Sequence, residues 1–384
     1  MNRFGFSIVS LLATLLSILL LSGCGNKSNI KPPEPLKPFV STIKVHELWA
    51  NNIGNGNGGL DLSLQPAIHQ DTVYAVSNDG EVVASNLYSG KRKWEVQLDS
   101  GLSSSPLYCG NKILFGSMSG QFYALDALTG KKLWQASLAS SVQVKAACGS
   151  DSVIVSTHDG SVAKYELNSG KLLWSQSISI PQLIMIGNSA PIIYKGKVLV
   201  GFANGELWAF DYITGGKLWD KTIAVPSGGS TTSQMVDINT TPIESSGMLY
   251  TASYQGNLLA FNITSQKDLW VRKFSTYSNM AKDLVNLYAI SASSTILAID
   301  RDSGSTVWKH VLLARRSLTA PLVFDKKIIV GDYQGYLHFF NKYTGVYLGR
   351  YQLSDVGISA APRVYKGIIV VQNDKGELFG LKIS

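Results

Sequence analysis

The chain has 384 residues, of which 45% are hydrophobic and 16% are charged, and its formal net charge is +8 at pH 7. This balance is typical of dense β-sheet and excludes a disordered polyelectrolyte. The sequence contains no basic run interleaved with aromatic residues, which is the usual pattern of single-strand binding. We therefore expect a solvated, mildly basic surface and no nucleic-acid partner.

The N-terminus is predicted to be a targeting segment that takes no part in the fold. A short basic start precedes an apolar run from Phe4 to Leu21, and LSGC at Leu21–Cys24 resembles the signal box of bacterial lipoproteins. The resemblance implies a signal peptide over residues 1–23, cleavage before Cys24, and acylation of the Cys24 thiol and amine. Because Gly25 and not aspartate follows, it also implies the periplasmic face of the outer membrane. A simple membrane-anchor helix is the alternative interpretation.

Residues 24–42 are predicted to be the lipidated cysteine and a proline-rich tether. The prolines of this segment are Pro32, Pro33, Pro35 and Pro38. An extended chain at about 3.1 Å per residue would let the tether span about 55 Å. The rest of the protein, residues 43–384, would then hang in the periplasm and contact the membrane only through its lipid anchor.

Residues 43–384 repeat one pattern about every forty residues. In GQFYALDALTGKKLW, Gly120 predicts a hairpin turn and the alternating apolar residues after it predict a half-buried strand. Asp126 with Thr129-Gly130 predicts a second turn, and the strand after that turn carries Trp134. Another strand pair precedes each copy, so one unit is four short strands, which suits a β-propeller blade. The copies begin at Gly80, Gly120, Gly160, Gly205, Gly256, Ser294 and Gly335.

A tryptophan recurs at one place in the pattern, and we interpret it as the residue that docks neighbouring blades. The seventh copy departs from the pattern, because Gly349 stands where the tryptophan should be. The fifth copy has Ser265-Gln266 in place of the usual hydroxyl residue and glycine. The docking residues are Trp49, Trp94, Trp134, Trp174, Trp219, Trp270 and Trp308.

An eighth copy begins at Gly376, but the sequence ends at Ser384, before the outer strand of that unit. The segment from Lys44 to Ala50 can supply the missing strand, with Trp49 as its docking ring. We therefore predict an all-β fold, an eight-bladed β-propeller of four-stranded antiparallel blades whose last blade is closed by the N-terminal strand. An open repeat array is the alternative.

The remaining cysteines and histidines do not suggest a reactive site. Cys109 and Cys148 occupy nearly equivalent places in adjacent repeats. Equivalent turns of neighbouring blades usually lie farther apart than the roughly 7 Å that a disulfide allows, so we expect two small buried or turn residues and keep a disulfide between them as the less favoured alternative. The histidines form no HExxH pair, and no GxSxG elbow occurs. We predict no metal, no cofactor and no catalytic residue.

The phrase ALDxxTGKxxW resembles the tryptophan-docking motif of quinoprotein dehydrogenases, which hold pyrroloquinoline quinone in an eight-bladed propeller. In that family the cofactor stacks beneath adjacent cysteines, near a calcium site and a catalytic aspartate. This sequence has no adjacent cysteine pair and is much shorter. The shared phrase therefore specifies the blade and not the reaction. A quinoprotein enzyme and a binder of an envelope polymer are kept as alternatives.

Two long inter-blade intervals are predicted to lie on one face and to form one patch. The first contains IPQLIMIGNSAP, from Ile180 to Pro191, and the second contains PSGGSTTSQMVDINTTP, from Pro226 to Pro242. The apolar run from Leu183 to Ile186 stands in a loop context, which favours an exposed surface for a protein partner. The alternatives are an inner strand for this run and a turn cap for Asp237.

Several features together resemble the BamB family, lipoproteins of the outer-membrane β-barrel assembly machinery. They are the lipoprotein box, the tether, WxxxxGxGxG from Trp49, the blade phrase, LxMxGxSAP from Leu183 and VDINTTP around Asp237. The similarity covers essentially the whole chain. It implies a non-enzymatic scaffold that binds the periplasmic POTRA domains of BamA, within a complex that holds other lipoproteins. Whether unfolded outer-membrane proteins bind directly is left open.

Carrying the family's binding loops over by motif implies five partner-binding residues. Ile186 stands where the family often has arginine, and Asn239 stands where a second aspartate is common. The contact would therefore be mainly apolar and not a charged pairing. The five residues are Leu183, Met185, Ile186, Asp237 and Asn239.

Overall fold

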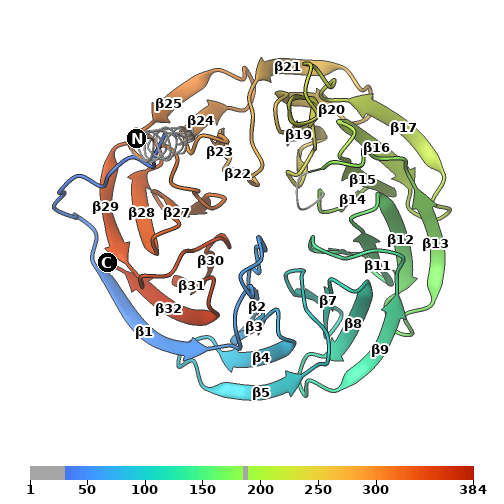
Figure 1. The fold of residues 1–384 in the computed structure, drawn as a ribbon, viewed down its shortest axis with the longest axis horizontal. Helices are drawn as coiled ribbons and strands as arrows, with labels where there is room; N and C mark the ends of the chain where they lie inside the picture. Colours follow the sequence, from blue (N-terminus) through green and yellow to red (C-terminus); the bar gives the residue numbers. More distant parts are fainter. Residues whose placement is uncertain (1–30, 185–188) are drawn as a thin grey trace, which may run out of the picture. The chain divides into compact units, whose positions relative to one another are not determined.

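The computed structural model of the chain describes residues 31–184 and 189–384. Its strands form eight four-stranded sheets in which every neighbouring pair is antiparallel. The sheets stand around a ring as the blades of a propeller (Figure 1). The predicted eight-bladed, all-β fold is therefore confirmed, and the compact unit that contains it runs from Glu34 to Ser384.

The blades follow one another along the chain, and each begins at its innermost strand. Blades 1 to 4 contain β2 (Ala67–His69), β3 (Thr72–Val76), β4 (Glu81–Asn86) and β5 (Arg92–Gln97); β6 (Leu107–Cys109), β7 (Lys112–Gly116), β8 (Gln121–Asp126) and β9 (Lys132–Ser137); β10 (Ala147–Cys148), β11 (Ser152–Ser156), β12 (Ser161–Glu166) and β13 (Leu172–Ser177); and β14 (Ile192–Tyr194), β15 (Lys197–Gly201), β16 (Glu206–Asp211) and β17 (Lys217–Thr222). Blades 5 to 8 contain β18 (Ile243–Ser245), β19 (Met248–Ala252), β20 (Asn257–Asn262) and β21 (Asp268–Lys273); β22 (Ala281–Lys282), β23 (Asn286–Ile290), β24 (Ile296–Asp300) and β25 (Thr306–His310); β26 (Leu322–Phe324), β27 (Lys327–Gly331), β28 (Tyr336–Asn341) and β29 (Tyr347–Gln352); and β30 (Arg363–Tyr365), β31 (Ile368–Gln372), β32 (Glu377–Ile383) and β1 (Val45–Asn52).

The hydrophobic core lies between the blades. The second strand of blade 1, β3, is buried along its whole length, and β4 is buried except at its two ends. One core cluster joins Tyr74 and Val76 of blade 1 to Ile113 and Phe115 of blade 2. Because a blade on each side covers them, the middle strands are apolar on both faces and do not alternate strictly.

The N-terminal strand closes the ring, as predicted. β1 pairs antiparallel with β32, with Val45 opposite Ile383 and Ala50 opposite Phe379. The indole of Trp49 lies against Gly380, where an added Cβ would come within 2.2 Å of the ring. The two ends of the propeller are therefore joined by main-chain hydrogen bonds within one sheet, which leaves blade 8 complete.

Six of the seven repeated tryptophans contact the next blade in the same way, and Trp219 is the exception because Gln266 replaces the turn glycine of blade 5. The indole N–H of Trp94 donates to the carbonyl oxygen of Ala127 at 3.0 Å, and that of Trp134 donates to Leu167 at 2.9 Å. The turn glycine of the receiving blade faces the ring, because a Cβ on Gly130 would lie 2.7 Å from Trp94. Glycine is required here for two reasons. The turn needs a positive φ, which is 74° at Gly130, and the indole packs where a side chain would otherwise stand. Bonds of the same kind are made by Trp49, Trp174, Trp270 and Trp308.

The expectation of two unpaired cysteines was wrong. Cys109 and Cys148 form a disulfide with their Cα atoms 5.7 Å apart. They end β6 and β10, the innermost strands of blades 2 and 3. Neighbouring blades converge toward the axis of the ring, so equivalent positions on innermost strands come within disulfide reach although outer positions do not.

The compact unit begins earlier than the expected boundary at residue 43. Residues 34–42 already contact blade 7 and the linker that precedes it. The amide of Glu34 donates to Ala314 O at 3.0 Å, and the amide of Thr42 donates to Leu348 O at 2.8 Å. Cys24 and the signal segment lie outside the described residues. Within the described part of the chain, no helix has the length and apolar character needed to cross a membrane.

Candidate partner-binding surface

The two long linkers lie on one face of the ring, on either side of blade 4. Each blade's outer strand leads back to the turn between its second and third strands. The amide of Ile178 donates to Gly160 O at 3.2 Å, and the amide of Ile223 donates to Gly205 O at 2.9 Å. We call this side, which carries the turns at Gly160 and Gly205, the top face. The linker of residues 178–191 enters blade 4 here, and the linker of residues 223–242 leaves it.

The first linker presents an apolar side chain to solvent. Ile180 packs against the core between blades 3 and 4, which fixes where the linker leaves that core. Leu183 follows with 45% of its surface exposed, and Leu183 and Ile184 belong to no strand. The alternative of an inner strand is therefore not seen for these two residues. Met185 and Ile186 lie outside the described residues.

The second linker is held by its own hydrogen bonds. Val225 stands at its start with 71% of its surface exposed. A single 3₁₀ turn, η1 (Thr232–Gln234), closes on Ser230, whose amide donates to Ser233 Oγ at 3.0 Å. Gln255 Nε2 of blade 5 donates to Thr232 O at 3.0 Å and ties the turn to the next blade. The polar sequence of this linker therefore forms an ordered loop.

Asp237 lies beneath this surface and not on it. Its side chain is only 2% exposed, and its neighbours Val236 and Ile238 are each 1% exposed. Ile238 packs onto Gly201, where an added Cβ would meet it at 2.3 Å, and its amide donates to Phe202 O at 3.1 Å. The segment around Asp237 is thus wedged between blades 4 and 5, and its aspartate does not face solvent.

Asn239 is half-buried in the same segment. Its Oδ1 is shielded from solvent and has no hydrogen-bond partner among the described residues. The next residue, Thr240, donates through Oγ1 to Ala252 O at 2.7 Å. Equivalent hydroxyls enter other blades, since Thr319 Oγ1 accepts from Gly331 N and Ser104 Oγ accepts from Gly116 N.

A sequence signal could have revealed this burial. A serine or threonine two residues before a proline precedes the inner strand of several blades, as in SSP, SAP, TTP and TAP. The end of VDINTTP is therefore a regular blade entrance and not part of an exposed loop.

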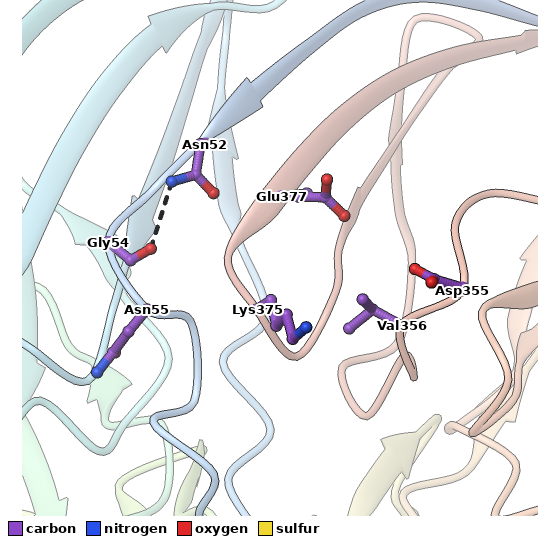
Figure 2. A pocket seen from close by; sticks show the side chains of 7 residues that line it. All are labelled: Asn52, Gly54, Asn55, Asp355, Val356, Lys375 and Glu377. Carbon is purple, nitrogen blue, oxygen red and sulfur yellow. Dashed lines mark hydrogen bonds between the residues drawn. The ribbon is translucent and has the colours of Figure 1, made fainter.

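The ring closure holds a second feature of the surface. A hollow at the ring closure lies between the segment that follows β1, the loop between blades 7 and 8, and the turn before β32 (Figure 2). Its lining includes two carboxylates and one lysine but no histidine, cysteine or serine; the residues are Asn52, Gly54, Asn55, Asp355, Val356, Lys375 and Glu377. Among the described residues, no group of three or more His, Cys, Asp or Glu side chains is placed to hold a metal ion.

Comparison with known proteins assigns the family. A family model described as "Outer membrane protein assembly factor BamB" matches residues 46–182 and 89–310. A protein of that name from Francisella tularensis is 44% identical over 96% of this chain and 82% of its own length. Another from Pseudomonas aeruginosa is 42% identical over 97% of this chain and 98% of its own length. The chain belongs to the BamB family.

Solved structures agree with this assignment. The crystal structure of BamB from Moraxella catarrhalis matches with a TM-score of 0.80 at 26% identity, covering 88% of this chain and 100% of that chain. A quinohemoprotein alcohol dehydrogenase from Comamonas testosteroni matches with a TM-score of 0.69 at 13% identity, covering 88% of this chain and 76% of that chain. That second likeness shows the fold alone. The BamB relatives are named as assembly factors, so family membership gives a non-enzymatic protein.

Proposed function

We propose that this chain is a non-enzymatic scaffold of the outer-membrane β-barrel assembly machinery, and that its top-face loops bind the periplasmic POTRA domains of BamA. Membership of a family of outer-membrane protein assembly factors supports the general role. The observation that carries the finer proposal is the pair of long linkers that flank blade 4 on one face. Both expose apolar side chains there, Leu183 at 45% and Val225 at 71%.

The fold suits a binding role because it holds these loops in place before the partner arrives. The second linker is ordered by bonds within it and by Gln255 of the next blade. Ordering a flexible side chain or loop on binding costs roughly 0.5–1.5 kcal/mol for each side chain, so a pre-ordered loop loses less entropy when it docks. An apolar contact at Leu183 would add about 1–2 kcal/mol when its remaining exposed surface is covered.

The five residues implied by family resemblance take two roles in this proposal. Leu183, with Met185 and Ile186 after it, would contact the partner directly. Asp237 is too buried for direct contact, so it and Asn239 would position the second linker from beneath. A change at Asp237 would then weaken binding by altering the shape of the loop.

The anchor completes the proposal. The lipoprotein box at Leu21–Cys24, together with family membership, supports acylation of Cys24 and a location on the periplasmic face of the outer membrane. The other lipoproteins of the complex would be neighbours there.

The test replaces Leu183 with aspartate in the full-length, lipidated protein. An unpaired carboxylate in an apolar contact should cost about 3 kcal/mol in total, or roughly a hundredfold in affinity. BamA recovered with the tagged variant from detergent-solubilised envelopes should therefore fall sharply. Ile213→Asp is the matched control, because Ile213 is 72% exposed in a turn on the opposite face. Undiminished recovery of BamA with Leu183→Asp would overturn the loop assignment.

A further inference from the structure

Blade 7 breaks the repeat at Gly349, and the structure shows what occupies the place of the tryptophan. An added Cβ on Gly349 would lie 2.0 Å from Ser41 Oγ and 2.9 Å from Ser41 Cα. The N-terminal segment therefore runs over the outer strand of blade 7, across the position where the other seven blades place an indole. We call residues 34–42 the strap.

The strap is bonded to β29 along its length. The amide and the hydroxyl of Thr42 both donate to Leu348 O at 2.8 Å. Arg350 Nη1 donates to Lys37 O at 2.9 Å. The ring of Phe39 meets the ring of Tyr347 edge-on, with centroids 4.8 Å apart. A free tether would make none of these contacts, since its backbone would be solvated.

The far end of the strap is held by a buried arginine. Arg316 is 2% exposed, and its Nη1 donates to Glu34 O at 3.0 Å. The amide of Glu34 donates to Ala314 O at 3.0 Å, and its carboxylate pairs with Arg315 Nη2 at 2.6 Å. Three consecutive residues of the linker between blades 6 and 7 therefore contact Glu34.

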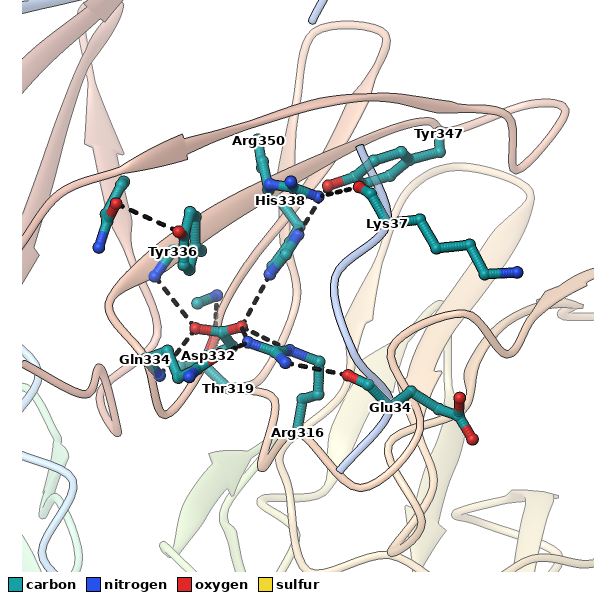
Figure 3. Close-up of polar contacts among 12 residues, drawn as sticks. Glu34, Lys37, Arg316, Thr319, Asp332, Gln334, Tyr336, His338, Tyr347 and Arg350 are labelled. Atoms are coloured by element: carbon teal, nitrogen blue, oxygen red, sulfur yellow. Dashed lines mark hydrogen bonds and ion pairs between the residues drawn. The ribbon is translucent and has the colours of Figure 1, made fainter. Parts of the chain in front are cut away.

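A buried polar cluster fixes Arg316 from the other side (Figure 3). Arg316 donates through Nε to Asp332 Oδ2 at 2.8 Å, and Asp332 is fully buried. The same carboxylate oxygen lies 3.0 Å from Nε2 of His338, whose Nδ1 is 2.9 Å from the hydroxyl of Tyr347. The cluster thus extends from Arg316, which is hydrogen-bonded to Glu34, to Tyr347, whose ring contacts Phe39.

The negative charge of Asp332 in this cluster is paired with the positive charge of Arg316. Burial alone would raise the pKa of Asp332, but His338 and Arg316 hold it below its ordinary value. Burial lowers the pKa of His338, although Asp332 acts against this. Asp332 is then a carboxylate paired with Arg316, and His338 is neutral. A buried ion pair is costly to desolvate and contributes little net stability by itself. Arg316 contacts Glu34 of the strap directly, and Asp332 is linked through His338 to Tyr347, which contacts Phe39. This arrangement indicates that the pair helps to hold the strap.

We propose that the strap is a built-in latch that replaces the missing tryptophan and fixes the N-terminal segment, from Glu34 onward, to the rim of blade 7. This rests on the proposed function for the acylation of Cys24. The chain that comes from the lipid anchor would then join the propeller at Glu34, and release of the strap would add residues 34–42 to the segment between the anchor and the ring.

The latch is tested by hydrogen exchange on the full-length lipoprotein in vesicles without BamA. The wild-type amides of Glu34 and Thr42 should be protected, and Gly349→Trp, which places an indole where Ser41 lies, should raise their exchange at least tenfold. Because that variant can also fail to fold, Phe39→Ala and Arg350→Ala are measured beside it and should each raise exchange severalfold. Val40→Ala is the matched control, because Val40 is 89% exposed and should leave exchange unchanged. Wild-type exchange at the free-peptide rate would overturn the proposal, as would unchanged protection in all three strap variants.

The anchor geometry is tested by energy transfer from a dye on Leu312→Cys to acceptor lipids in the same vesicles. Leu312 is 54% exposed in the linker that receives Glu34. Transfer should be higher in the wild type than in the variants that release the strap, because release adds residues 34–42 to the segment between the anchor and the ring. Equal transfer with and without a protected strap would overturn the anchor half of the proposal. Leu183→Asp should leave strap protection and transfer intact while losing BamA, so failure of the latch and failure of the loop assignment are separate results.

Discussion

Trp134→Ala probes the docking of one blade on the next. The indole of Trp134 is 8% exposed, its N–H donates to Leu167 O at 2.9 Å, and its face covers Gly170 of blade 3. Truncating a buried tryptophan costs about 3–5 kcal/mol, and losing the hydrogen bond to Leu167 is part of that loss. For a unit of this size the entropy of unfolding is about 0.7 kcal/mol/K, so the melting temperature should fall by about 4–7 °C.

The assay is thermal unfolding followed by circular dichroism and repeated in urea. Leu133→Ala is the control, because Leu133 is the neighbouring residue on β9, points to the other face and is 45% exposed. Leu133→Ala should cost less than about 1 kcal/mol. BamA recovery should be unchanged for Trp134→Ala at temperatures where the variant is folded. Equal, small destabilisation by the two substitutions would refute the view that the repeated indole joins the blades.

Three further variants test other parts of the structure. Removing the Cys109–Cys148 bond in a double serine variant should lower the free energy of unfolding by up to about 4 kcal/mol, because the bond closes a loop with a sequence separation of 39 and so restricts the unfolded chain. A urea midpoint equal to that of the wild type would contradict this. Burial lowers the pKa of His310 to about 4, so the unfolded chain binds a proton that the folded chain refuses, and stability should fall as pH falls from about 6.5 toward 4. His310→Asn should flatten that slope in urea titrations at pH 7.5 and pH 5, and an unchanged slope would argue against it. Asp237→Ala should lower both the free energy of unfolding and the recovery of BamA, whereas Leu183→Asp should lower the recovery alone. An Asp237→Ala protein as stable as the wild type would show that the buried aspartate does not support the structure.

The fold was predictable because the same physical requirements recur in every unit. A turn glycine, a capping acid or amide and a docking tryptophan appear at fixed spacing, and each has one structural purpose. The closure by β1 followed from counting strands, since the eighth copy lacked its outer strand and Trp49 stood alone near the N-terminus.

The misread features depend on three-dimensional position. The disulfide joins two residues one repeat apart, and only their place on innermost strands near the axis makes the distance short enough. Asp237 lies in a long, polar linker and was predicted to bind a partner, yet it is buried between two core residues, Val236 and Ile238.

The strap was hidden for a related reason. Gly349 was a visible departure from the repeat, but nothing in the local sequence says that residues 34–42 fill the space. A proline-rich segment of this kind reads as a tether until its contacts with blade 7 are seen.

Photo-crosslinking from position 183 in intact envelopes tests the central claim most directly. A crosslinking residue at Leu183 should give an adduct with the POTRA domains of BamA, and the same residue at Ile213, on the opposite face, should not. An adduct pattern that is the same from both positions, or the absence of any BamA adduct from position 183 in folded, lipidated protein, would contradict the account.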